Sequence, residues 1–283
     1  MKNRNTQLLS LVLIFCFVGF FVLKHKNQQH SYDRQTYDQR ARPRTNENLS
    51  SSQGNHLIPD FDHAKKRAKD LYSTQQVDFY CDCPYKQGQI LESQCSYKVH
   101  DDPTRARRIE WEHIVPASQF GHSFPEWNEG HPECQSPDGK KYRGRKCARK
   151  MSQEFRMMEA DLYNLVPAVG EVNMMRGNLA MRTLGPQEDF ESVCSLKIGS
   201  NGVEPSDSLK GFIARTYLYM DRAYPQTRIL TETMKEQMRA WDKKFPTTTL
   251  ELTRARRIAQ IQGNINPFVT PQIAANTSSP TTR

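Results

Sequence analysis

The sequence lacks several features that assign proteins to common classes. It contains no internal repeat, no glycine-rich P-loop and no dinucleotide-binding glycine fingerprint. These absences exclude a repeat architecture and remove the usual support for an enzyme that depends on nucleoside triphosphates or nicotinamide cofactors. Apolar residues are also scarce, at 36% of the chain, partly because both ends are polar. The 283 residues are still enough for one large domain or two small ones.

Acidic residues are too few to balance the basic ones. The chain has 40 Lys and Arg against 31 Asp and Glu, which gives a net charge of +9 and a pI of about 9.2. This balance favours a polyanionic partner, either a nucleic acid or an anionic membrane. Charge alone does not choose between the two.

Cysteine is present in a pattern that indicates export. There are seven cysteines, and Cys16 lies in an apolar run near the N-terminus. The other six are Cys81, Cys83, Cys95, Cys134, Cys147 and Cys194. An even set in a chain that looks exported predicts three disulfides. A zinc site is the alternative, but the Cys-x-Cys spacing at Cys81 is not the usual Cys-x2-Cys knuckle, and export favours oxidation.

The spacing of the cysteines also suggests how they pair. We expect Cys134 to pair with Cys147 across a loop-rich segment. We expect the remaining four to form one disulfide within the region of Cys81, Cys83 and Cys95 and one that joins this region to Cys194. The two cysteines of the Cys-x-Cys pair are too close in sequence to pair comfortably with each other.

The N-terminal region predicts an exported or anchored protein. Residues 1–25 combine a short basic leader with an apolar run at 8–23, as in a secretory signal or a membrane anchor. The run is short for a span, which needs about 20 residues, but no small-x-small cleavage site follows it, so an uncleaved anchor is favoured. We expect residues 26–60 to be a polar linker, 61–269 the globular domain and 270–283 a disordered tail.

Hydrophobic periodicity predicts that the C-terminal third is helical. The apolar residues of 209–220 recur at three- and four-residue spacing, which is typical of a helix that is buried along one side. A strand is predicted at residues 77–81. The predicted helices span residues 62–71, 152–163, 209–220, 230–245 and 250–261.

Residues 108–117, with the sequence RIEWEHIVPA, are the most informative stretch. Their apolar positions suit a buried strand, and Pro116 prevents the strand from continuing. Glu112 and His113 are consecutive, and neighbours on a regular strand point to opposite faces. If both serve one site, the strand must end or bulge there. Taken alone, such a pair is more often a surface charge beside a packed structural histidine.

A second segment, residues 161–173 with the sequence DLYNLVPAVGEVN, follows about fifty residues later. A strand that ends at His113, an Asn-Leu-x-Pro turn that begins at Asn164, and a helix that carries Asn173 form the outline of a ββα-metal nuclease finger. The second segment therefore favours a catalytic site at Glu112 and His113 over a surface charge beside a structural histidine.

These side chains suit the hydrolysis of a phosphodiester, which requires a base, a positive centre and assistance to the leaving oxygen. His113 has an unperturbed pKa near 6.5, so its neutral imidazole can accept a proton. Glu112 and Asn173 offer oxygen ligands, which favour Mg²⁺ over Zn²⁺ and leave positions for water and phosphate. Arg176 follows Asn173 by one helical turn and is a candidate to hold a phosphate oxygen. In isolation, Asn173 and Arg176 are more often surface residues.

Residues 121–150 form a loop-like insertion rich in Gly, Pro and basic residues. A charge run of this kind is usually only a solvated surface. Its position between the two halves of the candidate site raises the alternative of a phosphate-contacting surface. The candidate substrate contacts are Lys140, Lys141, Arg143, Arg145 and, at the start of the first segment, Arg108.

These segments resemble the bacterial endonuclease I family, which comprises periplasmic or secreted nucleases of the ββα-metal (His-Me finger) class. The resemblance covers roughly residues 61–269. The motifs that carry it are IEWEHIVPA at 109–117, FYCDC at 79–83, DLYNLVP at 161–167 and GEVN at 170–173.

The resemblance implies a mixed α+β domain with a His-Me finger at the floor of a positively charged cleft and a helical C-terminal half. It implies that His113 is the general base, that Glu112 and Asn173 are the Mg²⁺ ligands, and that Asn164 orients the finger. Mn²⁺ or another hard divalent ion can replace Mg²⁺. Members cut DNA, and often RNA, with little sequence preference, and leave 5′-phosphates.

Two departures from the family leave the candidate catalytic positions intact. Many members carry a further cysteine pair where this chain has Leu252 and Ile273, and the N-terminal run looks retained. The leading hypothesis is a monomeric, Mg²⁺-dependent, sequence-non-specific endonuclease acting on DNA, with RNA as a second substrate, in the periplasm or outside the cell. The alternatives are a non-catalytic exported nucleic-acid-binding or uptake protein, and a cysteine-stapled module that binds anionic lipid or polysaccharide.

Overall fold

The computed structural model describes residues 54–269. The predicted signal or anchor at 1–25, the predicted linker up to residue 53 and the predicted disordered tail at 270–283 lie outside the described residues. None of the helices within 54–269 is long and apolar enough to cross a bilayer.

Buried contacts begin before Phe61, where we placed the start of the globular domain. Asn55 and Ile58 are both buried. The side-chain amide of Asn55 donates to the carbonyl oxygens of Ile58 (2.7 Å) and Met157 (2.8 Å). These contacts attach residues 55–58 to the helical part of the domain.

Ten helices and seven strands are assigned within the described residues. The helices are α2 (Phe61–Leu71), α3 (Pro103–Ala106), α4 (Ala117–Gly121), α5 (Pro125–Asn128), α6 (Arg145–Met151), α7 (Gln153–Glu159), α8 (Gly170–Arg176), α9 (Asp207–Ala223), α10 (Glu232–Lys244) and α11 (Thr249–Gln262). The strands are β1 (Tyr85–Lys86), β2 (Gln89–Ile90), β3 (Ile109–His113), β4 (Leu165–Val169), β5 (Phe190–Val193), β6 (Leu196–Gly199) and β7 (Val203–Pro205). Short 3-10 helices cover Glu92–Gln94, Leu162–Asn164 and Pro225–Thr227.

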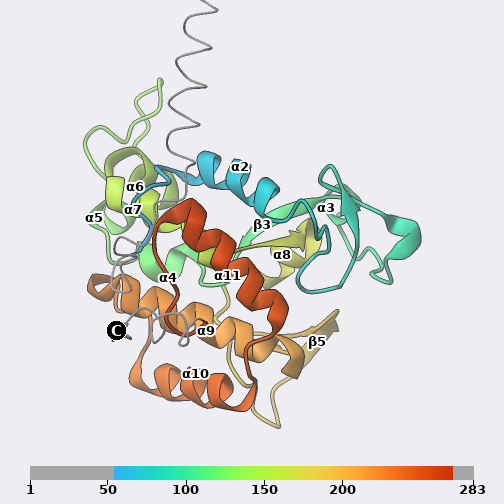
Figure 1. Cartoon of the computed structure of the whole chain (residues 1–283). Helices are drawn as coiled ribbons and strands as arrows, with labels where there is room; N and C mark the ends of the chain where they lie inside the picture. The colour runs from blue at the N-terminus through green and yellow to red at the C-terminus, as the bar shows by residue number, and fades with distance from the viewer. Residues whose placement is uncertain (1–53, 270–283) are drawn as a thin grey trace, which may run out of the picture. The chain divides into compact units, whose positions relative to one another are not determined.

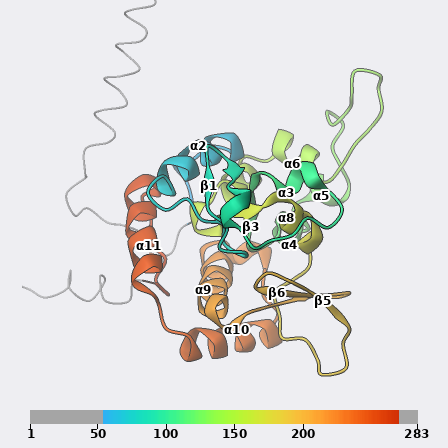
Figure 2. The same ribbon diagram turned by 90° about the vertical axis from the view of Figure 1, so that its right-hand side faces the viewer.

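The strands form three small antiparallel sheets, β1–β2, β3–β4 and β5–β6–β7. Helices and small sheets are mixed along the chain, which confirms the α+β class. The long helices α9 and α10 pack against each other below β3 and α8 (Figures 1 and 2). The predicted helical C-terminal third is confirmed by α9, α10 and α11.

The β3–β4 pair is the central element of the candidate site. The predicted strand is confirmed as β3, which ends at His113, ahead of Pro116. The Asn-Leu-x-Pro turn is a wrong prediction, because residues 165–169 form strand β4. Pro167 pairs with Trp111 in the register of this sheet. A two-stranded sheet has only edge strands, and an edge strand tolerates a proline that lacks an N–H.

Local side-chain capping decides where two other elements begin and end. Ser152 caps α7 by accepting from the backbone N–H of Phe155, as expected. The helix stops at Glu159, four residues earlier than predicted, and Asp161 then caps a 3-10 turn. The strand predicted at 77–81 is wrong, because the carboxylate of Asp78 accepts backbone N–H bonds from residues 80, 81 and 83 and folds this segment into a turn.

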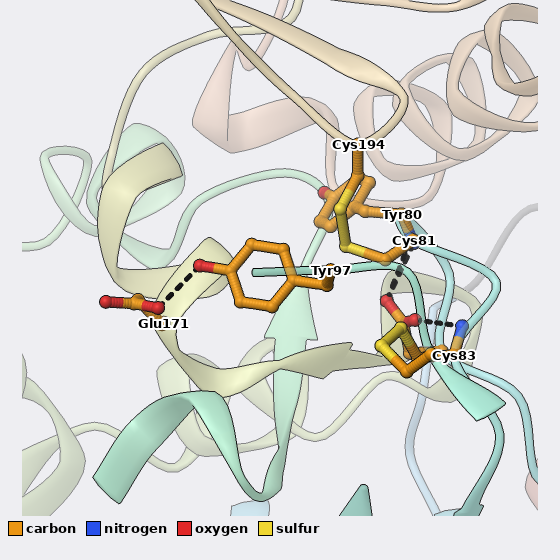
Figure 3. The surroundings of a disulfide bond; sticks show 8 residues. Tyr80, Cys81, Cys83, Tyr97, Glu171 and Cys194 are labelled. Carbon is orange, nitrogen blue, oxygen red and sulfur yellow. Dashed lines mark hydrogen bonds between the residues drawn. A yellow bond between two sulfur atoms is a disulfide. The ribbon is translucent and has the colours of Figure 1, made fainter. Parts of the chain in front are cut away.

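Two of the three disulfides close short loops and the third joins distant parts of the domain. Cys134 pairs with Cys147, as predicted. Cys83 pairs with Cys95, and Cys81 pairs with Cys194 over 113 residues (Figure 3). The link within the Cys-x-Cys region and the link to Cys194 are therefore confirmed, and the zinc alternative fails for these six thiols.

Two further segments differ from the sequence-based expectations. The sheet β5–β6–β7, at residues 190–205, was not predicted. The basic insertion at 121–150 is not entirely loop, because it contains helix α5 and ends in helix α6, whose Cys147 and Ala148 are buried. Basic residues at the start of α6 are therefore held on a helix next to the core.

Candidate active site

Strand β3 and helix α8 present side chains to each other in matched pairs. Glu110 and Glu112 are two residues apart on the strand, so they share a face, and Asn173 and Arg176 are three apart on the helix and also share a face. Asn173 contacts Glu110 (Nδ2 to Oε2, 3.1 Å), and Arg176 contacts Glu112 (Nη1 to Oε1, 2.9 Å). His113 follows Glu112 at the end of the strand and lies on the opposite face.

His113 is buried and its imidazole is fixed on three sides. Its Nε2 donates to the backbone carbonyl of Glu159 at 2.8 Å, which leaves Nδ1 as the acceptor. A terminal nitrogen of Arg145 lies 3.4 Å from Nδ1, and the ring of Phe61 lies 4.9 Å away between centroids. Burial, with the positive charge of Arg145, lowers the pKa of His113 to about 3. The imidazole is therefore neutral at physiological pH, as a general base requires.

Glu112 is almost completely buried, at 3% exposure. Its Oε1 accepts from the hydroxyl of Tyr80 at 3.1 Å as well as from Arg176. Burial raises the pKa of the Glu112 carboxyl, and the guanidinium of Arg176 and the Tyr80 hydroxyl oppose that rise. A further cation at this carboxylate would favour its ionised form.

Arg176 joins the end of β3 to α8. Its side chain is 1% exposed, and besides Glu112 it donates to the carbonyl oxygens of His113 (2.8 Å) and Ile114 (2.5 Å). Its Nε is buried and has no hydrogen-bond partner within residues 54–269. The prediction that Arg176 holds a phosphate oxygen is therefore wrong, because its side chain is buried and both terminal nitrogens bind Glu112 and the backbone at His113 and Ile114.

Glu110 lies at the centre of a second polar cluster. Arg105 binds its carboxylate through two nitrogens, Arg108 donates to it at 3.0 Å, and Asn173 donates from its amide nitrogen. The backbone at Gly170 approaches closely here, because a Cβ at this position would lie 2.7 Å from the carbonyl oxygen of Arg105. With the amide nitrogen of Asn173 directed to Glu110, its Oδ1 remains available as a ligand.

Asn164 joins the end of β3 to the start of β4. Its Oδ1 accepts from the backbone N–H of Val115 at 2.7 Å, and its Nδ2 donates to the carbonyl of Val115 at 3.0 Å. The backbone N–H of Ile114 donates to the carbonyl of Asn164 at 3.1 Å. These bonds hold the chain immediately after His113 against the second strand.

The predicted basic contacts divide into two groups. Arg145 lies against His113, and Arg108 lies in the Glu110 cluster. Lys140, Lys141 and Arg143 are exposed on the insertion. Arg143 donates to the carbonyl of Asn128 at 3.0 Å. Among the contacts of the described residues, none joins these three to the candidate base or ligands.

The donor set fits a hard divalent ion. Glu112 offers a carboxylate oxygen and Asn173 an amide oxygen, and both are on the β3–α8 side of the site. Oxygen ligands of this kind, few in number, leave room for water and phosphate, as Mg²⁺ prefers. Within residues 54–269 there is no group of three or more His, Cys, Asp or Glu that could hold a metal ion.

A well-formed cavity lies elsewhere. It has a volume of about 520 Å³ and lies among α2, the 77–82 segment, α9 and α11, where Tyr72, Phe79 and Phe212 form part of its wall. None of the candidate catalytic, metal-ligand or substrate residues lines it. The chemistry of the site therefore belongs to the β3–β4–α8 unit and not to this cavity.

Sequence reasoning missed several members of the site. Glu110 carries a usable signal, since it precedes Glu112 by two residues on a predicted strand and must share its face. Glu159 and Phe61 carry none, because their roles depend on contacts between segments that are distant in sequence. Tyr80 lies in the FYCDC motif at 79–83, but the motif does not reveal its contact with Glu112.

Comparison with known proteins gives one consistent family. The family model for Endonuclease I matches residues 45–272. An extracellular deoxyribonuclease of Aeromonas hydrophila is 36% identical over 219 residues, which cover 75% of this chain and 89% of that protein. A periplasmic deoxyribonuclease of the same organism is 36% identical over 209 residues, 71% of this chain and 81% of that protein.

A relative from a second organism gives the same result. Endonuclease-1 of Buchnera aphidicola subsp. Acyrthosiphon pisum (strain APS) is 37% identical over 218 residues, which cover 75% of this chain and 81% of that protein. The matched residues include β3, β4 and α8, which carry the candidate base and ligands. The chain belongs to the endonuclease I family and is an endonuclease.

Proposed function

We propose that this endonuclease is Mg²⁺-dependent, that it cleaves DNA without sequence preference and RNA as a second substrate, and that it leaves 5′-phosphates. The observation that carries the proposal is the neutral, oriented imidazole of His113 at the end of β3, beside a face that offers oxygen ligands. The names of the relatives, which are deoxyribonucleases and endonucleases, support DNA as the substrate. Two antiparallel strands followed by a helix, β3, β4 and α8, support the His-Me finger arrangement.

In this proposal His113 is the general base. The carbonyl of Glu159 holds the proton on Nε2, so Nδ1 takes a proton from the attacking water. The water oxygen forms a bond to phosphorus, and the bond from phosphorus to the 3′-oxygen breaks. The phosphate stays on the 5′-oxygen of the downstream nucleotide, and the released 3′-oxygen takes up a proton from solvent to become a 3′-hydroxyl. Arg145, next to Nδ1, binds the phosphate that is attacked.

The carboxylate side of the site would hold the ion through Glu112 and Asn173. A bound Mg²⁺ supplies positive charge to the phosphate and to the leaving oxygen. Arg176 positions Glu112 from beneath and fixes the backbone of His113. Glu110 orients the amide of Asn173 so that its oxygen is free. Through these contacts Arg176 is a positioning residue.

Location and assembly complete the proposal. Two of the relatives are named as extracellular and periplasmic, and three disulfides suit an oxidising compartment. We therefore place the chain in the periplasm or outside the cell, as a monomer, with an N-terminal anchor as one means of retention.

Plasmid DNA and structured RNA incubated with the protein, with and without EDTA, test this function. We expect nicking and linearisation that stop with EDTA and return with excess Mg²⁺ or Mn²⁺, and end-labelling that shows 5′-phosphates. Cleavage that persists in EDTA, or products with 3′-phosphates, would contradict the mechanism. Binding without cleavage would instead favour the uptake-protein alternative.

A further inference from the structure

Three cations surround the ring of Phe61, at the start of α2, beside the candidate base. The Cζ atoms of Arg145 and Arg149 lie 5.6 Å and 5.3 Å from the ring centroid, and Nζ of Lys65 lies 5.2 Å from it. The same ring lies 4.9 Å from the imidazole of His113. Phe61, Lys65, Arg145 and Arg149 are named here the Phe61 platform.

A buried carboxylate fixes both arginines of the Phe61 platform. The side chain of Glu159 is 1% exposed, and it accepts from Nε of Arg145 through one oxygen and from Nε of Arg149 through the other. The two arginine side chains are 41% and 40% exposed. Glu159 also holds His113 through its backbone carbonyl. One residue thus fixes the base and two accessible guanidinium groups.

Arg149 retains donors that no group within residues 54–269 uses. Its Nε binds Glu159, and its terminal nitrogens have no partner within residues 54–269. A guanidinium offers five N–H donors in a rigid fork, so these terminal nitrogens can still hold an anion through two bonds. Arg145 and Arg149 are four residues apart on α6 and therefore share a helix face.

We propose that the Phe61 platform binds a phosphate of the nucleic-acid strand next to the phosphodiester that is cut, and that Arg149 and Phe61 are substrate-binding residues. The proposal rests on the proposed function, in which His113 acts on a phosphodiester held by Arg145. One helical turn separates Arg149 from Arg145, so it reaches a neighbouring phosphate of the same strand. The Phe61 ring supports both guanidinium groups, and Lys65 adds positive charge.

The competing explanation is that Arg149 only neutralises the buried carboxylate of Glu159. The two explanations differ in how binding depends on salt. A protein side chain that contacts a phosphate releases a counterion and contributes about 0.9 to the slope of log affinity against log salt concentration. An arginine with a purely structural role contributes nothing to that slope.

The test measures DNA binding by the full chain in a His113→Ala background, at constant Mg²⁺, over a salt series and with two unrelated duplexes. We expect Arg149→Ala to weaken binding to both duplexes and to reduce the salt slope by about 0.9. Over a four-fold rise in salt, the background protein then loses about 3.5-fold more affinity than the variant. The matched control is Lys150→Ala, since Lys150 is the next residue on α6 and its Nζ already binds the carbonyl of Glu133.

Further variants keep the test independent of folding. Arg149→Lys retains the positive charge, so it should keep the slope of log affinity against log salt concentration. Its affinity should fall only because lysine lacks the paired nitrogens of a guanidinium. Phe61→Leu should weaken binding, and Phe61→Tyr should restore it, with unfolding temperatures measured for each protein. If the salt slope of Arg149→Ala equals that of the background protein, the assignment of Arg149 is overturned. If Phe61→Leu binds DNA as tightly as the background protein, the assignment of Phe61 is overturned. Wild-type cleavage by His113→Ala would instead refute the proposed function.

Discussion

The two faces of β3 are held in place by different kinds of interaction. On the carboxylate face, Glu110 and Glu112 are each fixed by ionised partners, of which Arg176 is almost completely buried. On the imidazole face, His113 itself is fixed by a backbone carbonyl and an aromatic ring, and the nearby charges of Arg145 and Arg149 are paired with Glu159 and not with His113. A neutral base needs only an oriented hydrogen bond and apolar cover, whereas two adjacent carboxylates need positive charge nearby.

This difference separates two kinds of failure. Damage to the carboxylate face should lower stability and metal affinity, because buried charges lose their partners. Damage to the imidazole face should lower turnover and leave metal binding nearly unchanged. The variants below test that difference.

The largest expected effect on stability comes from Arg176→Met. This change keeps most of the side-chain volume and leaves the buried carboxylate of Glu112 without its cation, so we expect a loss of about 3–5 kcal/mol in the free energy of unfolding. Urea unfolding at pH 7 measures it. Adding Glu112→Gln should recover part of the loss, because the unpaired charge is then removed.

An exposed ion pair supplies the control for this prediction. Arg107 and Glu92 pair at 3.2 Å with both side chains 61% exposed. Arg107→Met should change stability by less than about 1 kcal/mol. Equal losses at Arg107 and Arg176 would show that burial does not distinguish the two pairs.

Glu110→Gln should weaken the metal site without contacting the ion. The variant disturbs the hydrogen bond that orients Asn173, and the loss of a group that orients a metal ligand typically costs about 10–100-fold in metal affinity. Titration calorimetry with Mg²⁺ in the absence of DNA measures the effect. Glu92→Gln, an exposed acidic control, should leave the affinity unchanged. If both variants bind Mg²⁺ as the wild type does, Glu110 does not position Asn173.

Low pH should destabilise the carboxylate face of β3, because it protonates Glu171. Its burial raises its pKa, but backbone N–H bonds from residues 100–102 and the hydroxyl of Tyr97 outweigh burial and lower the pKa to about 2 (Figure 3). Because the folded pKa lies below the unfolded value, the stabilisation is fully present above about pH 4.5 and is lost as pH falls towards 2. This loop leads into α3, which carries Arg105.

The stability difference between wild type and Glu171→Gln should therefore shrink as pH falls from about 4.5 towards 2. Thermal unfolding at a series of pH values measures it. A difference that stays constant over this range would contradict the lowered pKa of Glu171.

The smallest effect should come from the exposed insertion. Replacing Lys140, Lys141 and Arg143 with Ala removes charges that do not touch the base or the ligands. We expect a moderate loss of affinity, similar for unrelated sequences and smaller at high salt, with turnover at saturating DNA unchanged. A loss confined to one sequence would indicate base readout instead of phosphate contact.

The sequence predicted the parts of the fold that depend on local signals. Strand β3, helix α2 and the three C-terminal helices follow from periodicity and from Pro116, and the disulfides follow from cysteine spacing and export. Strand β4 was missed because Pro167 looks like a turn residue until its edge position is known. The capping of the 77–83 segment by Asp78 has no periodic signal.

The sequence indicated candidate residues for the site, but it did not indicate which of them contact each other. The outline of a nuclease finger grouped Glu112, His113 and Asn173 as one candidate site, but it did not show that Arg176 contacts Glu112 while Asn173 contacts Glu110. That choice depends on the register between β3 and α8, which is set by tertiary packing. The cover of His113 by Phe61 likewise depends on how α2 packs against the finger.

The most direct test compares His113→Ala with Glu112→Ala in single-turnover DNA cleavage over a wide range of Mg²⁺ concentration. The account predicts that Glu112→Ala recovers part of its rate as Mg²⁺ rises, because its defect is in metal binding. It predicts that His113→Ala stays at least about 10²–10⁴-fold slower at saturating Mg²⁺, because its defect is in proton transfer. A His113→Ala protein that cuts DNA at near the wild-type rate under those conditions would contradict the account.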